Sequence, residues 1–250
     1  MVRIPGVEKF ADRFSRDHAK FVVIGGTARE LIYEDAGFFE DSSTKDLDVV
    51  LVAEAVDGEF VERFISFVSE GGYAHRTKDG RFQMFRFSKP VDKTFPAQIE
   101  LLSRRPDFIR DVEQKIGPVR VDDSDYSLSA ILLDDAYYGL ISSGLAVTEK
   151  YGMPTLRHEY LPLFKMRAYI DLLPDRKHEA DKHRRDIIKL FSLDMPPAPA
   201  GLPAKVLEDV RTFTESVTIP PDLMKRFGLG FIKGEEMLGL IEGYYLGDER

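Results

Sequence analysis

Two aspartates, Asp46 and Asp48, stand two residues apart at the start of an apolar run that ends at Val52. If this run is a strand, residues two apart point to the same side, so the two carboxylates lie together. Paired carboxylates beside a buried strand are costly unless a cation is bound to them. Divalent cations with oxygen ligands, Mg²⁺ or Mn²⁺, are the natural partners. The alternative is an exposed strand end at which the adjacent Lys45 supplies the positive charge.

A second group, Gly25-Gly26-Thr27, follows the apolar run from Phe21 to Ile24. A strand that runs into two glycines and then into a helix lets backbone N–H groups approach an anion, and the helix dipole favours negative charge there. The simpler alternative is a tight turn in which Thr27 caps its helix, with Glu30 completing a capping box. The dinucleotide-binding pattern and the P-loop pattern are both absent from this stretch.

The order of these motifs resembles the polymerase-β-like nucleotidyltransferase superfamily, in which a strand, Gly-Gly and a helix precede Asp-hydrophobic-Asp on a second strand. The Gly-Gly-Thr-Ala sequence looks most like the AbiEii-type branch, whose best-known members are toxins of type IV toxin–antitoxin systems. Close AbiEii relatives often have Ser and Arg where this chain has Thr44 and Lys45. The resemblance implies an NTP substrate, a divalent cation bound by two aspartates and phosphates bound at the glycines. The matching residues are Val22-Val23-Ile24-Gly25-Gly26-Thr27-Ala28 and Thr44-Lys45-Asp46-Leu47-Asp48-Val49-Val50.

The superfamily places a third carboxylate on a later strand, and Glu100 in Gln98-Ile99-Glu100-Leu101-Leu102 fits that position. A carboxylate between apolar neighbours on a strand is suited to be a third metal ligand or a general base. Asp92 and Asp107 are substitutes for this role, both in predicted loops.

The AbiEii-type branch also has a lysine in one helix and an aspartate in the next. Lys165, in the otherwise apolar stretch from Leu161 to Ala168, and Asp186 match this arrangement. The resemblance implies that Lys165 contacts nucleotide phosphate as a point charge, while Asp186 orients it or binds substrate. The alternative is an ion pair between two helices that binds no ligand.

The segment 176–189 around Asp186 is rich in Lys and Arg. Such a helix can face nucleotide or RNA phosphates, and the alternative is an ordinary solvated face. The five histidines are scattered without zinc-site spacing, so we assign no histidine metal site.

Composition excludes several classes of protein. The 250 residues include no cysteine, which rules out disulfides, thiolate metal sites and cysteine nucleophiles. The net charge of −8 argues against a surface that binds nucleic acid along its whole length. No apolar run is long enough to span a membrane, and no signal-peptide pattern stands at the N-terminus, so we expect a cytoplasmic protein.

Periodicity predicts the elements that must position these residues. We expect an α/β (α+β) chain, with a nucleotidyltransferase-like mixed sheet domain over 1–122, a helical region over 123–194 that completes the active site, and a proline-rich linker with C-terminal helices over 195–250. Predicted strands cover 21–24, 47–52, 81–88 and 97–102, and predicted helices cover 7–18, a segment from Thr27, 60–69, 127–139, 160–173, 178–193, 204–217, 221–227 and 234–246.

The function expected from these features is metal-dependent transfer of NMP from an NTP to an acceptor hydroxyl. RNA or tRNA, a protein and a small molecule all stay open as acceptors, and a toxin of this type would have an antitoxin protein as partner. The alternative from another class is a nucleotide-binding or partner-binding module of the same fold without catalysis. A third is an antibiotic-type small-molecule transferase, which would need a deep acceptor pocket.

Overall fold

A mixed sheet lies in the first of the two units into which the chain divides, Met1–Leu156 and Arg157–Arg250. This computed structural model describes residues 5–38, 44–78, 81–104, 116–119 and 128–247. The strands are β1 Phe21–Ile24, β2 Asp46–Leu51, β3 Ala74–Lys78, β4 Arg81–Ser88, β5 Gln98–Arg104, β6 Ile116–Val119, β7 Leu128–Leu133, β8 Leu145–Val147 and β9 Pro154–Leu156. They confirm a mixed α/β fold class, with a helical region after the sheet.

Strand β2 lies at the centre of the sheet, whose order is β3-β4-β5-β2-β1-β9-β8. It runs antiparallel to β1 and parallel to β5, and β4 runs antiparallel to β5. Strand β7 pairs with both β5 and β6. The first unit extends to Leu156 rather than ending near residue 122, because β7, β8 and β9 all join this sheet.

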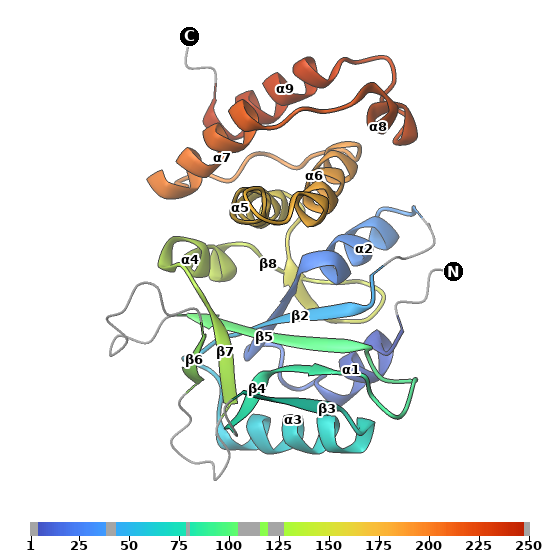
Figure 1. Cartoon of the computed structure of the whole chain (residues 1–250), viewed down its shortest axis with the longest axis vertical. Helices are drawn as coiled ribbons and strands as arrows, with labels where there is room; N and C mark the ends of the chain where they lie inside the picture. The colour runs from blue at the N-terminus through green and yellow to red at the C-terminus, as the bar shows by residue number, and fades with distance from the viewer. Residues whose placement is uncertain (1–4, 39–43, 79–80, 105–115, 120–127, 248–250) are drawn as a thin grey trace. The chain divides into compact units, whose positions relative to one another are not determined.

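Helices cover both faces of the sheet. Figure 1 shows α3 on one side and α2 on the other. The side chain of Asp57 caps α3 by accepting a hydrogen bond from the backbone N–H of Phe60, and Gly72 ends this helix in the left-handed region. The helices of the first unit are α1 Val7–Arg13, α2 Gly25–Asp35, α3 Gly58–Gly71 and α4 Asp135–Ser143.

An aromatic cluster fills the space between the sheet and helices α1 and α3. The ring of Phe14 contacts those of Phe10, Phe60 and Phe64, with centroids 4.4–6.1 Å apart. Phe21 on β1 meets the ring of Phe10 edge to face. All five side chains are fully buried, so this cluster holds the sheet against its helices.

The two faces of β2 and β5 differ in character. Leu47 and Val49 on β2, and Ile99 and Leu101 on β5, are buried on the face of the aromatic cluster. The residues between them on each strand point to the opposite face because strand side chains alternate. Asp48 and Glu100 are only partly buried there and Asp46 is exposed, so this face carries the candidate carboxylates.

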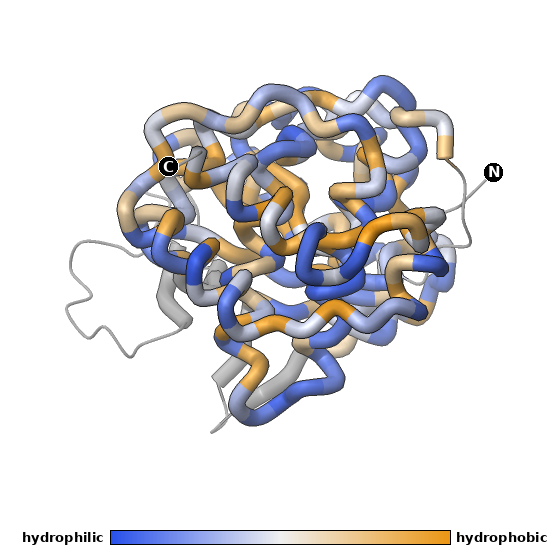
Figure 2. Tube along the Cα trace, turned by 90° about the horizontal axis from the view of Figure 1, so that it is seen from above, coloured by the Kyte–Doolittle hydropathy of each residue, from blue (hydrophilic) through white to orange (hydrophobic). Residues whose placement is uncertain are grey.

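The second unit consists of helices in its described part. Helix α5 packs against α6 and α7, and α7 packs against α9. Figure 2 shows hydrophilic and hydrophobic residues interspersed along the chain, as expected where helices and strands each have one buried face. The proline-rich segment before α7 forms neither helix nor strand, because proline lacks a backbone donor. The bounds are α5 Leu161–Leu172, α6 Lys177–Phe191, α7 Ala204–Ser216, α8 Pro221–Arg226 and α9 Gly234–Leu246.

Several predicted elements differ from the structure. The helix expected over 127–139 is wrong, because Leu128–Leu133 pairs with β5 and β6 as a strand and the helix starts only at Asp135. Helix α2 starts at Gly25 rather than Thr27. Strands β3, β6, β8 and β9 were not predicted, since their short segments gain stability only from pairing with distant strands.

None of the helices in the described residues is long and apolar enough to cross a membrane.

Truncating the aromatic cluster tests the core. The Phe64→Ala variant is expected to lower the free energy of unfolding by about 3–5 kcal/mol, because it leaves a cavity among packed rings. Urea denaturation followed by circular dichroism measures this loss. Phe231, which is 82% exposed, supplies the control: Phe231→Ala should change stability by no more than about 0.5 kcal/mol. Equal losses for the two variants would contradict this description of the core.

Burial of His183 on α6 predicts acid sensitivity. Desolvation, reinforced by the nearby charge of Lys165, lowers the pKa of His183 to about 4. Since the unfolded histidine titrates near its ordinary value, it binds a proton first as pH falls, and the folded state loses stability between about pH 6.5 and 4. His183→Gln should reduce the stability lost between pH 7 and 4.5 by about 2 kcal/mol. Urea titrations at both pH values measure this, and an unchanged pH dependence would refute it.

Candidate functional site

Asp46, Asp48 and Glu100 are brought together by the register of three strands. Asp48 on β2 lies opposite Ile24, the last residue of β1, and opposite Glu100 on β5. Neighbouring strands are about 4.8 Å apart, and residues in register point to the same face. Asp46 shares this face because it is two residues from Asp48. Asp46 is exposed, whereas Asp48 and Glu100 are half-buried.

The backbone of Gly25 approaches the Asp48 carboxylate more closely than any other residue type would allow. A Cβ atom on Gly25 would lie 1.8 Å from Asp48 Oδ2, and Gly25 has a φ of +72°. Both the missing side chain and the left-handed backbone conformation therefore require glycine here. The next residue, Gly26, is similarly close to Thr44, with 2.6 Å between its hypothetical Cβ and Thr44 Oγ1.

Thr27 does not cap helix α2. Its hydroxyl donates a 2.8 Å hydrogen bond to the backbone carbonyl of Asp46, which ties the start of the helix to the start of β2. The expected capping box is therefore wrong, and Glu30 instead forms an ion pair with Arg29. Ile24 occupies the N-cap position, and its apolar side chain makes no capping hydrogen bond. Helix α2 therefore begins beside Asp48, at the carboxylate corner formed by Asp46, Asp48 and Glu100.

Glu100 is held by two neighbours on the sheet. Gln98 Nε2 donates to Glu100 Oε1 over 2.9 Å, and Arg86 Nε lies 2.6 Å from the same oxygen. Arg86 is directly opposite Glu100 on β4, so it shares the face of the carboxylates. Sequence reasoning missed Arg86; the available signal was a single arginine between Phe85 and Phe87 in a predicted strand.

Asp46, Asp48 and Glu100 suit a divalent cation by their donor chemistry. Hard carboxylate oxygens are the ligands that Mg²⁺ and Mn²⁺ prefer. As the described side chains lie, no three carboxylates or histidines converge closely enough to hold a metal ion. In this arrangement Glu100 Oε1 faces Arg86 and Gln98.

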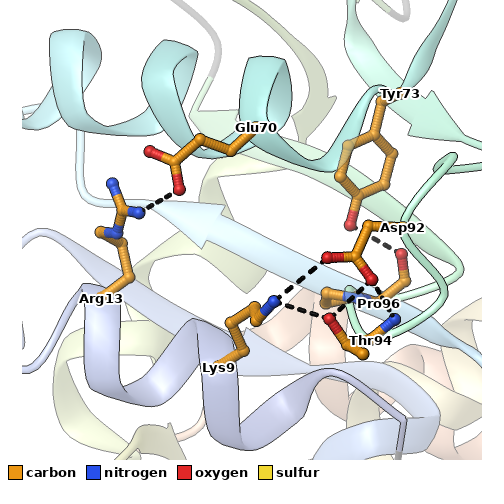
Figure 3. Close-up of polar contacts among 7 residues, drawn as sticks. All are labelled: Lys9, Arg13, Glu70, Tyr73, Asp92, Thr94 and Pro96. Carbon is orange, nitrogen blue, oxygen red and sulfur yellow. Dashed lines mark hydrogen bonds and ion pairs between the residues drawn. The ribbon is translucent and has the colours of Figure 1, made fainter.

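Asp92 lies in a separate polar cluster on the loop after β4. It accepts hydrogen bonds from the backbone N–H and the hydroxyl of Thr94 and pairs with Lys9 at 3.4 Å (Figure 3). The Thr94 backbone N–H, with help from Lys9, lowers the pKa of Asp92. These contacts give Asp92 a role in ordering the loop, apart from the carboxylate corner. Asp107, the other substitute, lies outside the described residues.

Lys165 and Asp186 form a buried ion pair between helices α5 and α6. Their Nζ and Oδ2 atoms are 2.6 Å apart, and the two residues are only 4% and 8% exposed. The two residues form the ion pair between helices that the sequence offers as the alternative to a nucleotide-binding role. A charge this deeply buried is tolerable only with such a partner.

The basic segment on α6 is partly neutralised by local contacts. Arg176 pairs with Glu179, and Arg184 pairs with Asp181 and donates to the carbonyl of Thr218. Lys177 and Lys182 are exposed on the same helix. The segment therefore has the mixed character of a solvated face, with a few cations directed outward.

Comparisons with known proteins give one structural likeness. No protein-family model and no curated protein sequence matches the chain. The crystal structure of an antigenic nucleotidyltransferase-like protein from Paracoccidioides brasiliensis is similar to this chain, with a TM-score of 0.47 and 14% sequence identity. The similarity covers 91% of this chain and 92% of that one.

Proposed function

We propose that this chain is a metal-dependent nucleotidyltransferase that transfers NMP from an NTP to an acceptor hydroxyl. The observation that carries this proposal is the corner at which Gly25 packs against Asp48, with Glu100 next to Asp48 in register. A helix N-terminus and clustered carboxylates at one place suit a ligand that combines phosphates with a divalent cation.

The carboxylates have the first role in the proposed reaction. Asp46 and Asp48 would hold Mg²⁺ or Mn²⁺, and Glu100 would complete a second site or accept the proton of the acceptor hydroxyl. A bound divalent cation neutralises phosphate charge and lowers the pKa of the attacking hydroxyl. The chain therefore supplies positioning and electrostatic stabilisation, which are the main needs of phosphoryl chemistry.

The start of α2 would bind the β- and γ-phosphates. Backbone N–H groups and the helix dipole at this end attract anions, and Gly25 and Gly26 add no side chain that would shield the backbone. Thr27 fixes this segment through its bond to the Asp46 carbonyl. The same hydrogen bond fixes the position of the proposed phosphate-binding backbone relative to the carboxylates.

Lys165 and Asp186 extend the proposal to the AbiEii-type branch. Lys165 would contact nucleotide phosphate, and its 2.6 Å bond to Asp186 would orient the ammonium group. RNA or tRNA, a protein or a small molecule would be the acceptor, and the toxin role with an antitoxin partner is part of the same proposal.

A nucleotide-binding module without catalysis is the second candidate function. The ion pair between Glu100 and Arg86 favours it, because a carboxylate neutralised by arginine is a poorer metal ligand or base. The two candidates differ in whether NMP is transferred.

Removal of Asp48 tests catalysis. Asp48→Asn and Glu100→Gln should each lower transfer at least about 100-fold, because each removes charge stabilisation from the transition state. Incubation with each labelled NTP, Mg²⁺ and total tRNA, followed by gel analysis, shows whether label reaches RNA or the protein. Asp92→Asn is the matched control and should keep wild-type transfer. Normal transfer by Asp48→Asn would refute the assignment, whereas nucleotide binding without any transfer would favour the binding module.

The buried pair can be separated into structural and functional parts. Lys165→Met should lower the free energy of unfolding by about 3–5 kcal/mol, because it leaves Asp186 charged and buried. The double variant Lys165→Met/Asp186→Leu should recover most of that stability yet remain inactive, if Lys165 contacts phosphate. Urea denaturation and the transfer assay measure the two effects. Recovery of transfer in the double variant would show that the pair is structural only.

A further inference from the structure

Arg86 is a cation at the carboxylate corner that the proposed reaction does not use. Its side chain is 37% exposed and lies on the sheet face of Asp46 and Asp48. Among the described residues, Glu100 is the carboxylate that it contacts, at 2.6 Å. Arg86 Nε is buried, yet it meets no acceptor there with hydrogen-bond geometry. The guanidinium is thus held mainly by charge, and its directed donor capacity is not fully used.

Glu100 cannot serve Arg86 and a divalent cation equally well. Its Oε1 atom faces both the Arg86 guanidinium and the Gln98 amide. A guanidinium beside the carboxylate repels an incoming cation and weakens its binding. A triphosphate would remove this conflict, because phosphate oxygens match the donor fork of arginine as well as a carboxylate does.

We propose that Arg86 is a phosphate ligand that Glu100 holds in place until substrate binds. The guanidinium then moves from Glu100 to the triphosphate, and Glu100 becomes available to the divalent cation. This inference rests on the proposed nucleotidyltransferase function and adds to it a phosphate-binding residue that couples the two ligands. It involves no covalent step.

The proposal predicts that removing Arg86 changes the affinities for metal and for phosphate in opposite directions. Removal of an arginine that only stabilises the fold would not have this effect. Without phosphate, Arg86 opposes cation binding, so its removal should strengthen the binding of Mn²⁺ alone. Without metal, Arg86 attracts phosphate, so its removal should weaken the binding of inorganic tripolyphosphate. A side chain that only stabilises the fold would weaken both when it is removed.

The test compares wild type with Arg86→Gln in the full chain. Mn²⁺ binding is measured by electron paramagnetic resonance, and tripolyphosphate binding in EDTA by calorimetry. We expect Arg86→Gln to bind Mn²⁺ at least about tenfold more tightly and tripolyphosphate at least about tenfold more weakly, the size of one charge-assisted hydrogen bond. Adding Glu100→Gln to this variant should abolish the gain in Mn²⁺ affinity.

Two further variants control for charge and folding. Arg104, at the other end of β5, is similarly exposed and forms a 2.8 Å ion pair with Glu54. Arg104→Gln should therefore change neither affinity. Arg86→Lys keeps the charge without the donor fork, so it should bind Mn²⁺ like wild type but tripolyphosphate more weakly. The Lys variant preserves the test if Arg86→Gln does not fold.

Each outcome decides between the proposals. Losses of both affinities, or no change in either, in Arg86→Gln would overturn the role of Arg86 while leaving the proposed function intact. Failure of wild type and Arg86→Gln alike to bind Mn²⁺ and tripolyphosphate would overturn the proposed function and this inference together.

Discussion

At Gly25 the backbone turns from β1 into α2 directly against the carboxylate of Asp48, where a Cβ atom would collide with Oδ2. The left-handed φ of Gly25 adds a second reason for glycine. Because β1 pairs with β2 at Ile24 and Asp48, this contact places a helix N-terminus beside the two aspartates. Two further features of the corner depend on it: the Thr27 bond to Asp46 and the position of Glu100.

The sheet can hold this corner because its two faces have different tasks. One face packs Leu47, Val49, Ile99 and Leu101 against the aromatic cluster, which supplies hydrophobic stabilisation. The other face carries Asp46, Asp48 and Glu100, whose charges would be unfavourable in a core. A shift of one residue in the register of β2 would exchange the faces, so the apolar face also fixes the carboxylates in place.

Charge compensation differs between the two units. In the sheet unit, Arg86 balances Glu100 on a half-exposed face, where an ion pair can be exchanged for other partners. In the helical unit, Lys165 and Asp186 are deeply buried, so removal of either partner lowers the stability of the fold much more. The neighbouring His183 is kept neutral by the same low-polarity surroundings and by the charge of Lys165.

The sequence by itself determined the local parts of this protein. The apolar runs predicted β1 and β2, and the spacing of Asp46 and Asp48 predicted their shared face, because strand alternation is a property of the chain alone. Helices α5, α6 and α9 were predicted within a few residues from their periodicity. Lys165 and Asp186 were singled out from a family resemblance as nucleotide-contacting residues, and the structure shows the alternative, an ion pair between two helices.

Only the tertiary structure decided which distant residues meet. Residues 128–133 became a strand rather than a helix, because pairing with β5 and β6 outweighed local preference. Thr27 bonds to the Asp46 carbonyl instead of capping its helix, and Arg86 faces Glu100, because strand pairing brought partners far apart in sequence together. The types of these residues can be read from the sequence, but the strand register that brings them together cannot. Register is set by the packing of the whole sheet.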